Sequence, residues 1–419
     1  MKEYLAKKYI FSVAFIVVVY VLAISNFIFS YDELEKSVKN SVEEAEITDI
    51  DSAFETANEF VSSLNNTMNE NVQGKYNYVE LYGLYNKVLG KNEYNGFDIV
   101  KDNNGYLLYG NLWNFNLDDN TNTEVFAQRV YNMQQKLEGT DTKLYVVGTP
   151  VKSMEEYLDF ETGIAYLDYN DTLDSYLYYC SVLNLRTVDL RTAMKKSGLD
   201  YEQMFFKTDH HWTPQAAFYG YKYLVETLKK DGYDLDPTGK YTSIDNYNLE
   251  TYENCWLGTF GINTGVNYLD EMESITILTP KFETEFVYQY KYPSSIYTNE
   301  ITGSFDGTLL QRKYIYEQVE NDLYQGSAYN VYLNGVCEYD HIENKNNPDG
   351  PKVLFIRDSY SSPLGSYIAN LCSEVDMVWA KEYGEKVEEL IENNDYDFIF
   401  VVTWPENLLD ESFEFYIED

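Results

Sequence analysis

Two parts of the chain alternate short apolar runs with stretches of helical spacing. In the first part, the run KLYVVGT at 143–149 is followed by a tyrosine- and leucine-rich helical stretch at 166–184 and by the run LRTVDL. In the second part, helices are expected at about 363–372 and 384–394, between the runs KVLFIRD (352–358), VDMVWA (375–380) and DFIFVVT (397–403). Strands this continuously apolar are covered on both faces. The pattern therefore predicts an α/β fold with a parallel central sheet and helices packed on either side.

The segments around these runs are less regular. Residues 32–74 are polar with apolar positions at helical spacing, which predicts a helical stalk. The stretch KYNYVELYGLYNKVLG at 75–90 is the first dense core signal, so the main domain is expected to span 75–419. Within it, residues 240–345 have mixed patterning. They are either an insertion with antiparallel strands that shapes a substrate cleft or ordinary structure at the edge of the sheet.

The N-terminal segment has the composition of a membrane-spanning helix. Residues 9–31 carry no charge, which is enough helix to cross a hydrocarbon core of about 30 Å. Three lysines precede this run and acidic residues follow it, so residues 1–31 are expected to form a cytoplasmic tip and a transmembrane signal-anchor. The alternative is a signal peptide cleaved near Ala23 to Ser25. In both cases the catalytic domain is expected to be extracytoplasmic.

Charge and cysteine content narrow the classes of partner. With 69 acidic and 31 basic residues, the formal net charge is −38. Nucleic acid is a poor partner for such a chain, because sequence-independent binding needs Lys and Arg to displace counterions from phosphates. The four cysteines are far apart and contain no Cys-x-x-Cys, so a zinc knuckle or redox pair is not supported. One or two disulfides stay open.

The stretch KTDHHWTPQ at 207–215 holds two of the three histidines of the chain. Thr213 and Pro214 are typical of a helix start, an N-cap followed by a residue suited to the first turn. Asp209, His210 and His211 are therefore expected on the loop that leads into a helix, where side chains can be aimed outside the core. A lone histidine on a core face is most often structural, whereas two in such a loop favour function.

A serine at the end of a predicted strand completes the set. In FIRDSYSSPLG at 355–365, Ser359 follows the strand and should lie where parallel sheets bind ligands, beyond the carboxyl ends of their strands. Taken alone, this serine could be only a helix cap. Together with Asp209 and His211 it matches the requirements of nucleophilic catalysis, in which an imidazole accepts the hydroxyl proton and a carboxylate orients the imidazole. A Gly-x-Ser-x-Gly elbow and a P-loop are both absent.

These motifs resemble the DHHW family of SGNH hydrolase-like proteins. TDHHWTPQ followed by a strand ending in RDSY carries the resemblance, together with ELYGLYNKVLG, VVGTPVK and VDL, over residues 75 to about 410. The family is similar to the alginate O-acetylation proteins. The resemblance implies a three-layer α/β/α SGNH domain in which Asp and His precede Ser.

Carried over by position, the resemblance implies Asp209 as the orienting acid, His211 as the base and Ser359 as the nucleophile, with the Ser359 amide as an oxyanion donor. No cofactor and no bound metal are expected. The chain departs from the family at two positions, where Arg357 replaces a glycine and Tyr360 replaces a phenylalanine. An oxyanion-hole asparagine is not evident. Candidates for substrate contact are His210, Trp212, Lys152, Arg357 and Tyr360; Lys152 and Arg357 are equally candidates for a structural role.

The resulting hypothesis is serine-dependent acyl transfer, most simply O-acetylation of a cell-surface or exported polysaccharide. Since an extracytoplasmic enzyme cannot reach cytosolic acetyl donors, the resemblance also implies a membrane-bound O-acyltransferase partner. An acetyl esterase would use the same residues with water as acceptor, and a non-catalytic glycan-binding protein is a further alternative. A metal site built from Asp209, His210, His211 and His341 is the least favoured, because adjacent residues rarely direct both side chains at one ion.

Overall fold

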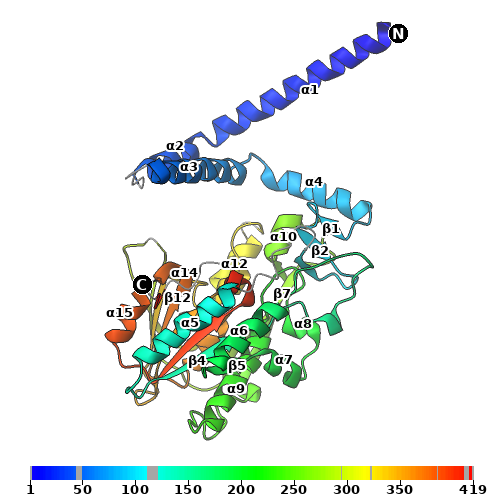
Figure 1. The fold of residues 1–419 in the computed structure, drawn as a ribbon. Coiled ribbons are helices and arrows are strands. Elements are labelled where there is room, and N and C mark those ends of the chain that lie inside the picture. The colour runs from blue at the N-terminus through cyan, green and yellow to red at the C-terminus, as the bar shows by residue number, and fades with distance from the viewer. Residues whose placement is uncertain are drawn as a thin grey trace. The chain divides into compact units, whose positions relative to one another are not determined.

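The computed structural model describes residues 2–43, 50–110, 121–293, 295–320, 323–384, 386–409 and 415–417. The chain forms two compact units, Met1–Leu84 and Tyr85–Asp419 (Figure 1). The second unit contains the predicted parallel sheet and both of the motifs that suggest chemistry.

A mixed sheet of eight strands forms the centre of the second unit, in the order β5-β4-β13-β11-β12-β10-β8-β9. Five of its strands are the runs predicted from the sequence, and they pair with one another in parallel: β4 (Lys143–Gly148), β5 (Arg186–Asp189), β11 (Lys352–Arg357), β12 (Glu374–Trp379) and β13 (Phe398–Thr403). The α/β fold with a parallel core is therefore confirmed.

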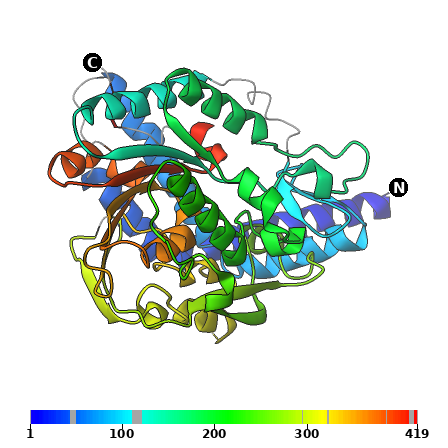
Figure 2. The ribbon, with the colours of Figure 1, turned by 90° about the horizontal axis from the view of Figure 1, so that it is seen from below.

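Helices cover both faces of this sheet, as Figure 2 shows. Successive residues of each buried strand point to opposite faces, so Tyr145 and Val147 join one core cluster while Leu144 and Val146 join another. The first cluster contains residues of α9 (Pro214–Lys230) and α13 (Ser361–Ile368). The second contains residues of α5 (Thr121–Lys136), α6 (Asn170–Val182) and α15 (Lys386–Glu392). The three-layer α/β/α arrangement follows.

Residues 240–345 contain antiparallel strands, some in the main sheet and some outside it. Three strands extend the main sheet in antiparallel fashion beyond β12: β10 (Tyr339–Asn344), β8 (Phe286–Lys291) and β9 (Asn299–Gly303). Two others, β6 (Tyr247–Trp256) and β7 (Glu273–Pro280), pair as a separate antiparallel ribbon. Short helices lie between the strands: α10 (Thr259–Thr264), α11 (Phe305–Thr308) and α12 (Lys313–Glu320).

The remaining elements of the second unit are small. A three-stranded antiparallel sheet consists of β1 (Glu93–Tyr94), β2 (Ile99–Lys101) and β3 (Leu107–Tyr109). The described part of the unit also contains three short α-helices, α7 (Arg191–Ser197), α8 (Tyr201–Met204) and α14 (Ala380–Tyr383), and several 3-10 turns. The four cysteines all lie in described segments, and each is buried and free, so the disulfides left open by the sequence are not formed.

The first unit consists of helices. α1 (Lys2–Phe29) contains the apolar span Lys7–Phe29, which by length and composition could cross a membrane. The stretch expected to be one stalk helix contains two, α2 (Tyr31–Glu43) and α3 (Ile50–Glu70), which lie side by side with Ser37 and Ser63 hydroxyls 2.8 Å apart. Folding back shields apolar residues such as Leu34, which a single helix would leave in water.

The segment 75–90 differs from its prediction. It forms α4 (Lys75–Val88), but its apolar side chains are not core: Leu81 is 66% exposed and Val88 is 76% exposed. The segment is apolar, as its composition shows, but the prediction that its side chains are buried in the core is wrong. By contrast, Leu107 and Leu108 of GYLLYG are buried, as that run predicted.

Candidate active site

The loop before α9 and the turn after β11 meet at the carboxyl edge of the parallel strands. Ser359 lies two residues after the end of β11, and its Oγ is 2.7 Å from Nε2 of His211. On the other side of the ring, His211 Nδ1 lies 2.6 Å from Oδ1 of Asp209. Two segments 148 residues apart in the chain thus form one continuous line of polar contacts. It lies at the edge where ligands bind in open parallel sheets.

The loop that carries Asp209, His210 and His211, here called the histidine loop, is positioned by the start of α9. The Thr213 hydroxyl accepts a hydrogen bond from the Ala216 amide at 3.1 Å, and Pro214 is the first helical residue. The predicted N-cap is therefore confirmed. Buried apolar residues on one face anchor the helix: Ala217, Tyr221, Leu224, Val225 and Leu228. A loop that ends at such a fixed helix start can hold its side chains in one direction.

Asp209 is buried, and both of its carboxylate oxygens accept hydrogen bonds. Oδ1 also accepts from the His211 amide at 2.9 Å, and Oδ2 accepts from the Thr259 amide and hydroxyl at 2.8 and 3.0 Å. Burial raises the pKa of Asp209, but the charges of His211 and His210 and the hydrogen bonds outweigh this and hold that pKa well below its usual value. The ionised carboxylate favours a proton on Nδ1 of His211, which leaves Nε2 to accept a proton from Ser359.

Aromatic side chains fix the plane of the His211 ring. Tyr329 stacks on it with ring centres 4.0 Å apart and planes 19° apart. The Trp212 indole N–H donates to the Tyr329 hydroxyl and to the Tyr360 carbonyl, both at 3.1 Å. Trp212 and Tyr360 are fully buried beneath the loop. The expectation that they contact substrate is therefore corrected, because side chains without exposed surface support the loop instead.

Ser359 is partly exposed, while the residues on either side of it are buried. The Asp358 carboxylate accepts hydrogen bonds from the Tyr360 amide at 3.0 Å, from Asn407 Nδ2 at 3.1 Å and from the Trp404 amide. Burial raises the pKa of Asp358 to about 6. The N-cap of α13 is Tyr360, so the Ser359 hydroxyl does not serve as the helix cap and faces the imidazole instead.

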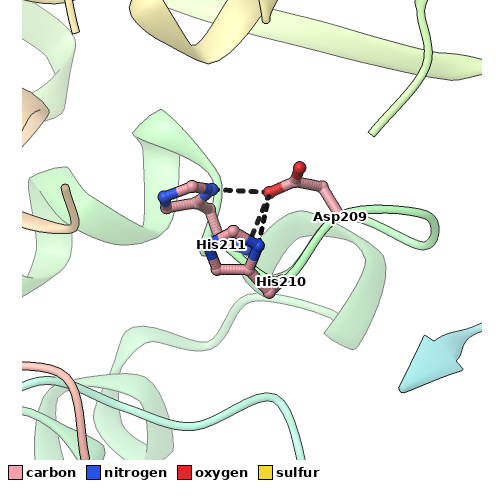
Figure 3. A group of neighbouring side chains, drawn as sticks. All are labelled: Asp209, His210 and His211. Carbon is pink, nitrogen blue, oxygen red and sulfur yellow. Dashed lines mark hydrogen bonds and ion pairs between the residues drawn. The ribbon is translucent and has the colours of Figure 1, made fainter. Parts of the chain in front are cut away.

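His210 lies beside the line of contacts without joining it. Figure 3 shows both imidazole rings turned toward the same oxygen of Asp209, but Nδ1 of His210 is 3.9 Å from it. That nitrogen is buried and has no hydrogen-bond partner among the described residues. Burial lowers the pKa of His210 to about 3, so the ring is neutral. The ring lies 5.0 Å from that of Trp404 and borders a small pocket with Phe260, where substrate contact stays a prediction.

Asp209, His210 and His211 are also the residues that could bind a metal ion. One ligand atom from each of Asp209, His210 and His211 lies within 4.8 Å of the others. However, both Asp209 oxygens already accept N–H or O–H donors, and both ring nitrogens of His211 are engaged. His341 lies on β10, where its Nδ1 is 2.7 Å from Asp376. The donor set therefore fits proton transfer better than it fits a metal.

A family model supports this interpretation of the fold. Residues 100–259 match the family described as the SGNH hydrolase-like domain of the acetyltransferase AlgX. The fold is SGNH hydrolase-like. The matched range includes Asp209 and His211 and ends before Ser359. No curated protein sequence matches the chain.

Solved structures agree with the SGNH-like fold. A DHHW family protein from Eubacterium siraeum is 16% identical, with a TM-score of 0.54 over 75% of this chain and 92% of that one. PatB1 from Bacillus cereus is 20% identical, with a TM-score of 0.57 over 74% of this chain and 96% of that one. A second PatB1 structure, 19% identical and with the same TM-score, covers 75% of this chain and 97% of that one and has a sulfonyl adduct. The resemblance inferred from the DHHW motif is thereby confirmed.

Within this SGNH-like domain, Lys152 supports the histidine loop from behind. Its buried ammonium donates to the carbonyls of Leu107, Lys207 and Asp209 at 2.7, 2.8 and 2.9 Å. Burial lowers the pKa of Lys152 to about 7, opposed by the charges of Glu273 and Asp209. Of the two roles considered for Lys152, the geometry fits the structural one, because all three ammonium protons are used within the protein.

We expect Lys152→Met to loosen this loop. The variant keeps most of the side-chain volume but leaves three carbonyls without their donor, so the free energy of unfolding should fall by about 3 kcal/mol. Urea unfolding followed by fluorescence measures the change. Lys195→Met on α7, an exposed site, is the matched control and should stay within about 0.5 kcal/mol of the wild type. Equal unfolding midpoints for the two variants would show that the three contacts contribute nothing.

Arg357 also has a structural environment. Its side chain is fully buried and forms an ion pair with Asp340, which is equally buried. It further donates to the Ser362 hydroxyl at 3.3 Å. A buried cation with a buried partner does not face a substrate. The arginine that departs from the family pattern therefore connects β11 to β10 and the start of α13.

Three supporting residues escaped the sequence analysis. Thr259 holds the Asp209 carboxylate, and Glu273 of β7 accepts a hydrogen bond from the Thr208 amide. Burial raises the pKa of Glu273 to about 7. At Gly258 an added Cβ would lie 2.2 Å from the Thr208 carbonyl oxygen, so only glycine permits this close approach. All three lie in the mixed region 240–345, where Gly-Thr at a helix start was the one available signal.

Proposed function

We propose that the chain is an extracytoplasmic enzyme of acyl transfer that uses Ser359, His211 and Asp209 as a catalytic triad. The observation that carries the proposal is the line of contacts from Asp209 through His211 to Ser359, at 2.6 and 2.7 Å. Both distances are within hydrogen-bond reach, which is the geometric requirement for a base and its nucleophile. Partial exposure of Ser359 gives an acyl donor access to the hydroxyl.

In the first step, Ser359 Oγ attacks the carbonyl carbon of an acetyl ester while His211 Nε2 takes the hydroxyl proton. The oxyanion that forms accepts a hydrogen bond from a backbone amide, for which we propose that of Ser359. As the intermediate collapses, the bond to the leaving alcohol breaks and His211 returns the proton to it. The result is an acetyl ester on Ser359, and Asp209 stabilises the imidazolium throughout.

In the second step, a hydroxyl group of a polysaccharide attacks the acetyl-enzyme, and His211 again accepts and returns one proton. The match of residues 100–259 to an acetyltransferase domain favours a sugar over water as the acceptor. The sulfonyl adduct of a PatB1 structure suggests sulfonyl reagents as probes of Ser359. Glycan is thus the proposed substrate, with no nucleic acid partner and no cofactor.

The span Lys7–Phe29 supports anchoring of this enzyme in the cell membrane with the SGNH-like domain outside. An enzyme in that location has no access to cytosolic acetyl donors. We therefore propose that a membrane-bound O-acyltransferase supplies the acetyl group across the bilayer, and that the chain delivers it to the glycan.

Acyl transfer is tested with an activated acetyl ester and a panel of cell-surface oligosaccharides. We expect the acetyl group to appear on Ser359 by mass spectrometry and then on an oligosaccharide, with faster release of the leaving group when acceptor is present. If acetate is the product with every acceptor, the enzyme is an esterase and transfer is excluded. Absence of acetyl-Ser359 together with unaltered ester turnover would remove the triad assignment.

A further inference from the structure

The helix α4 carries its apolar side chains outward. Five residues form what we call the α4 stripe, and all are exposed: Tyr78 (53%), Leu81 (66%), Tyr82 (41%), Tyr85 (56%) and Val88 (76%). At 100° per residue these positions fall on one side of the helix. Next to the stripe, about 100° around the helix from Tyr85, the polar residue Asn86 is fully buried. A helix at a protein surface normally shows the reverse arrangement, so the α4 stripe suggests a surface that meets an apolar environment.

The start of α4 is tied to the end of the apolar span of α1. The Ser30 hydroxyl donates to the Asn71 carbonyl at 3.0 Å, and the Gln73 amide donates to Asn26 Oδ1 at 3.1 Å. The Ser25 hydroxyl donates to the Gln73 side chain at 3.0 Å. Because α3 runs back along α2, the chain returns to where it left the span Lys7–Phe29. α4 therefore begins two residues beyond a contact with the last turns of the span.

These two observations determine which apolar environment fits. If α1 crosses a bilayer, residues 71–73 lie at the boundary between lipid and water, and α4 starts at that boundary. Tyrosine is enriched at this level, because its ring is apolar and its hydroxyl is polar. Helices with an apolar face of this kind lie in the plane of the interface, with that face about 5–10 Å into the headgroup and acyl boundary. With a net charge of −38, attraction to anionic lipid cannot be the driving force.

We propose that α4 is an interfacial helix whose stripe lies in the outer leaflet of the membrane. The proposal rests on the proposed anchoring by α1. The ligand is the lipid surface itself, and zwitterionic lipid should suffice.

The chain offers clean sites for a fluorescent test. Its four cysteines are buried, and burial raises the pKa of Cys180 to about 12 and that of Cys255 to about 11, so they react slowly with thiol reagents. An introduced surface cysteine can then be labelled selectively. We would place a nitrobenzoxadiazole label at Leu81→Cys in the full chain, reconstituted in phosphatidylcholine nanodiscs that contain lipid spin-labelled at a shallow or a deep position. Tyr178→Cys on α6, which is 63% exposed, is the matched control, and Val18→Cys reports on α1.

The three labels separate the possible outcomes. We expect shallow spin label to quench the Leu81 site at least about twofold more than the Tyr178 site, and deep spin label to quench the Val18 site most. Quenching at Val18 with equal quenching at Leu81 and Tyr178 would overturn the interfacial helix and leave the anchor intact, as when a protein partner covers the stripe. No quenching at Val18 would remove the anchor and the interfacial helix together. Ester turnover at Ser359, measured in parallel, reports on the proposed chemistry independently.

Discussion

Replacing Ser359 with alanine should abolish turnover of an acetyl ester reporter, with a fall in kcat of about 10⁴-fold or more. The hydroxyl removed lies 2.7 Å from Nε2 of His211, which in the proposed mechanism takes its proton as the oxygen accepts the acetyl group. Substrate binding does not need this hydroxyl, so KM should change little. The change is measured as kcat and KM with a chromogenic acetyl ester on the purified full chain.

Ser361→Ala is the matched control for this experiment. Ser361 lies in the same turn and is buried, and within the described part of the chain its hydroxyl has no hydrogen-bond partner. Its removal should therefore leave the free energy of unfolding nearly unchanged and kcat within about threefold of the wild-type value. If both serine variants retained full activity, the nucleophile would have to be sought elsewhere. If both lost it alike, with lower melting temperatures, the effect would be one of folding in this turn.

The parallel core of the domain could be predicted from the sequence because its strands are apolar on both faces. β4, β11, β12 and β13 are largely apolar runs, as expected of strands in a sheet covered on both faces, whereas the edge strand β5 is short and more polar. The antiparallel strands β8, β9 and β10 have alternating or mixed patterns that also suit loops or a ribbon. Their antiparallel pairing depends on partners distant in the chain, so the region 240–345 stayed open until the sheet was seen.

The residues of the site also fall into those that the sequence identifies and those that it does not. Asp209, His211 and Ser359 stand in short motifs with a recognisable chemical logic, and their meeting follows from where parallel strands end. The residues that hold them, Thr259 and Tyr329, act through contacts that no local pattern encodes. Trp212, Tyr360 and Arg357 were singled out because they flank the motifs, and the structure shows that flanking positions here face the interior.

A similar argument explains the wrong prediction for residues 75–90. Apolar content at 75–90 indicates that a surface avoids water, but it does not say whether protein or lipid covers that surface. In α4 the apolar residues are exposed while Asn86 is buried. Apolar content alone therefore does not show that a helix is buried, and only the direction of its side chains separates a core helix from an exposed one.

Asp209→Asn should lower kcat by about 10³- to 10⁴-fold and leave KM nearly unchanged. Each oxygen of the carboxylate accepts hydrogen bonds from N–H groups, namely those of His211 and Thr259. An amide must turn its NH₂ group toward one of these sets. If it faces His211, the ring has to accept at Nδ1 and carry its proton on Nε2, where it can no longer take the proton of Ser359. If it faces Thr259, two N–H donors oppose each other and the loop is displaced.

Thr259→Val tests whether the carboxylate itself, and not the packing around it, causes this loss. The valine keeps the shape and the backbone donor and removes only the hydroxyl that lies 3.0 Å from Oδ2, so kcat should fall by no more than about tenfold. The stability of Asp209→Asn adds a second signature. Because the folded pKa of Asp209 is lowered, its carboxylate stabilises the wild type above about pH 4, and this advantage is lost as the pH falls below that value. The two proteins should therefore converge in unfolding free energy in acid. In the proposed mechanism, Asp209 acts on Ser359 by holding the proton of the His211 ring on Nδ1. If Asp209→Asn were as active as Thr259→Val, His211 would keep its proton on Nδ1 without the carboxylate, and this role of Asp209 would be wrong.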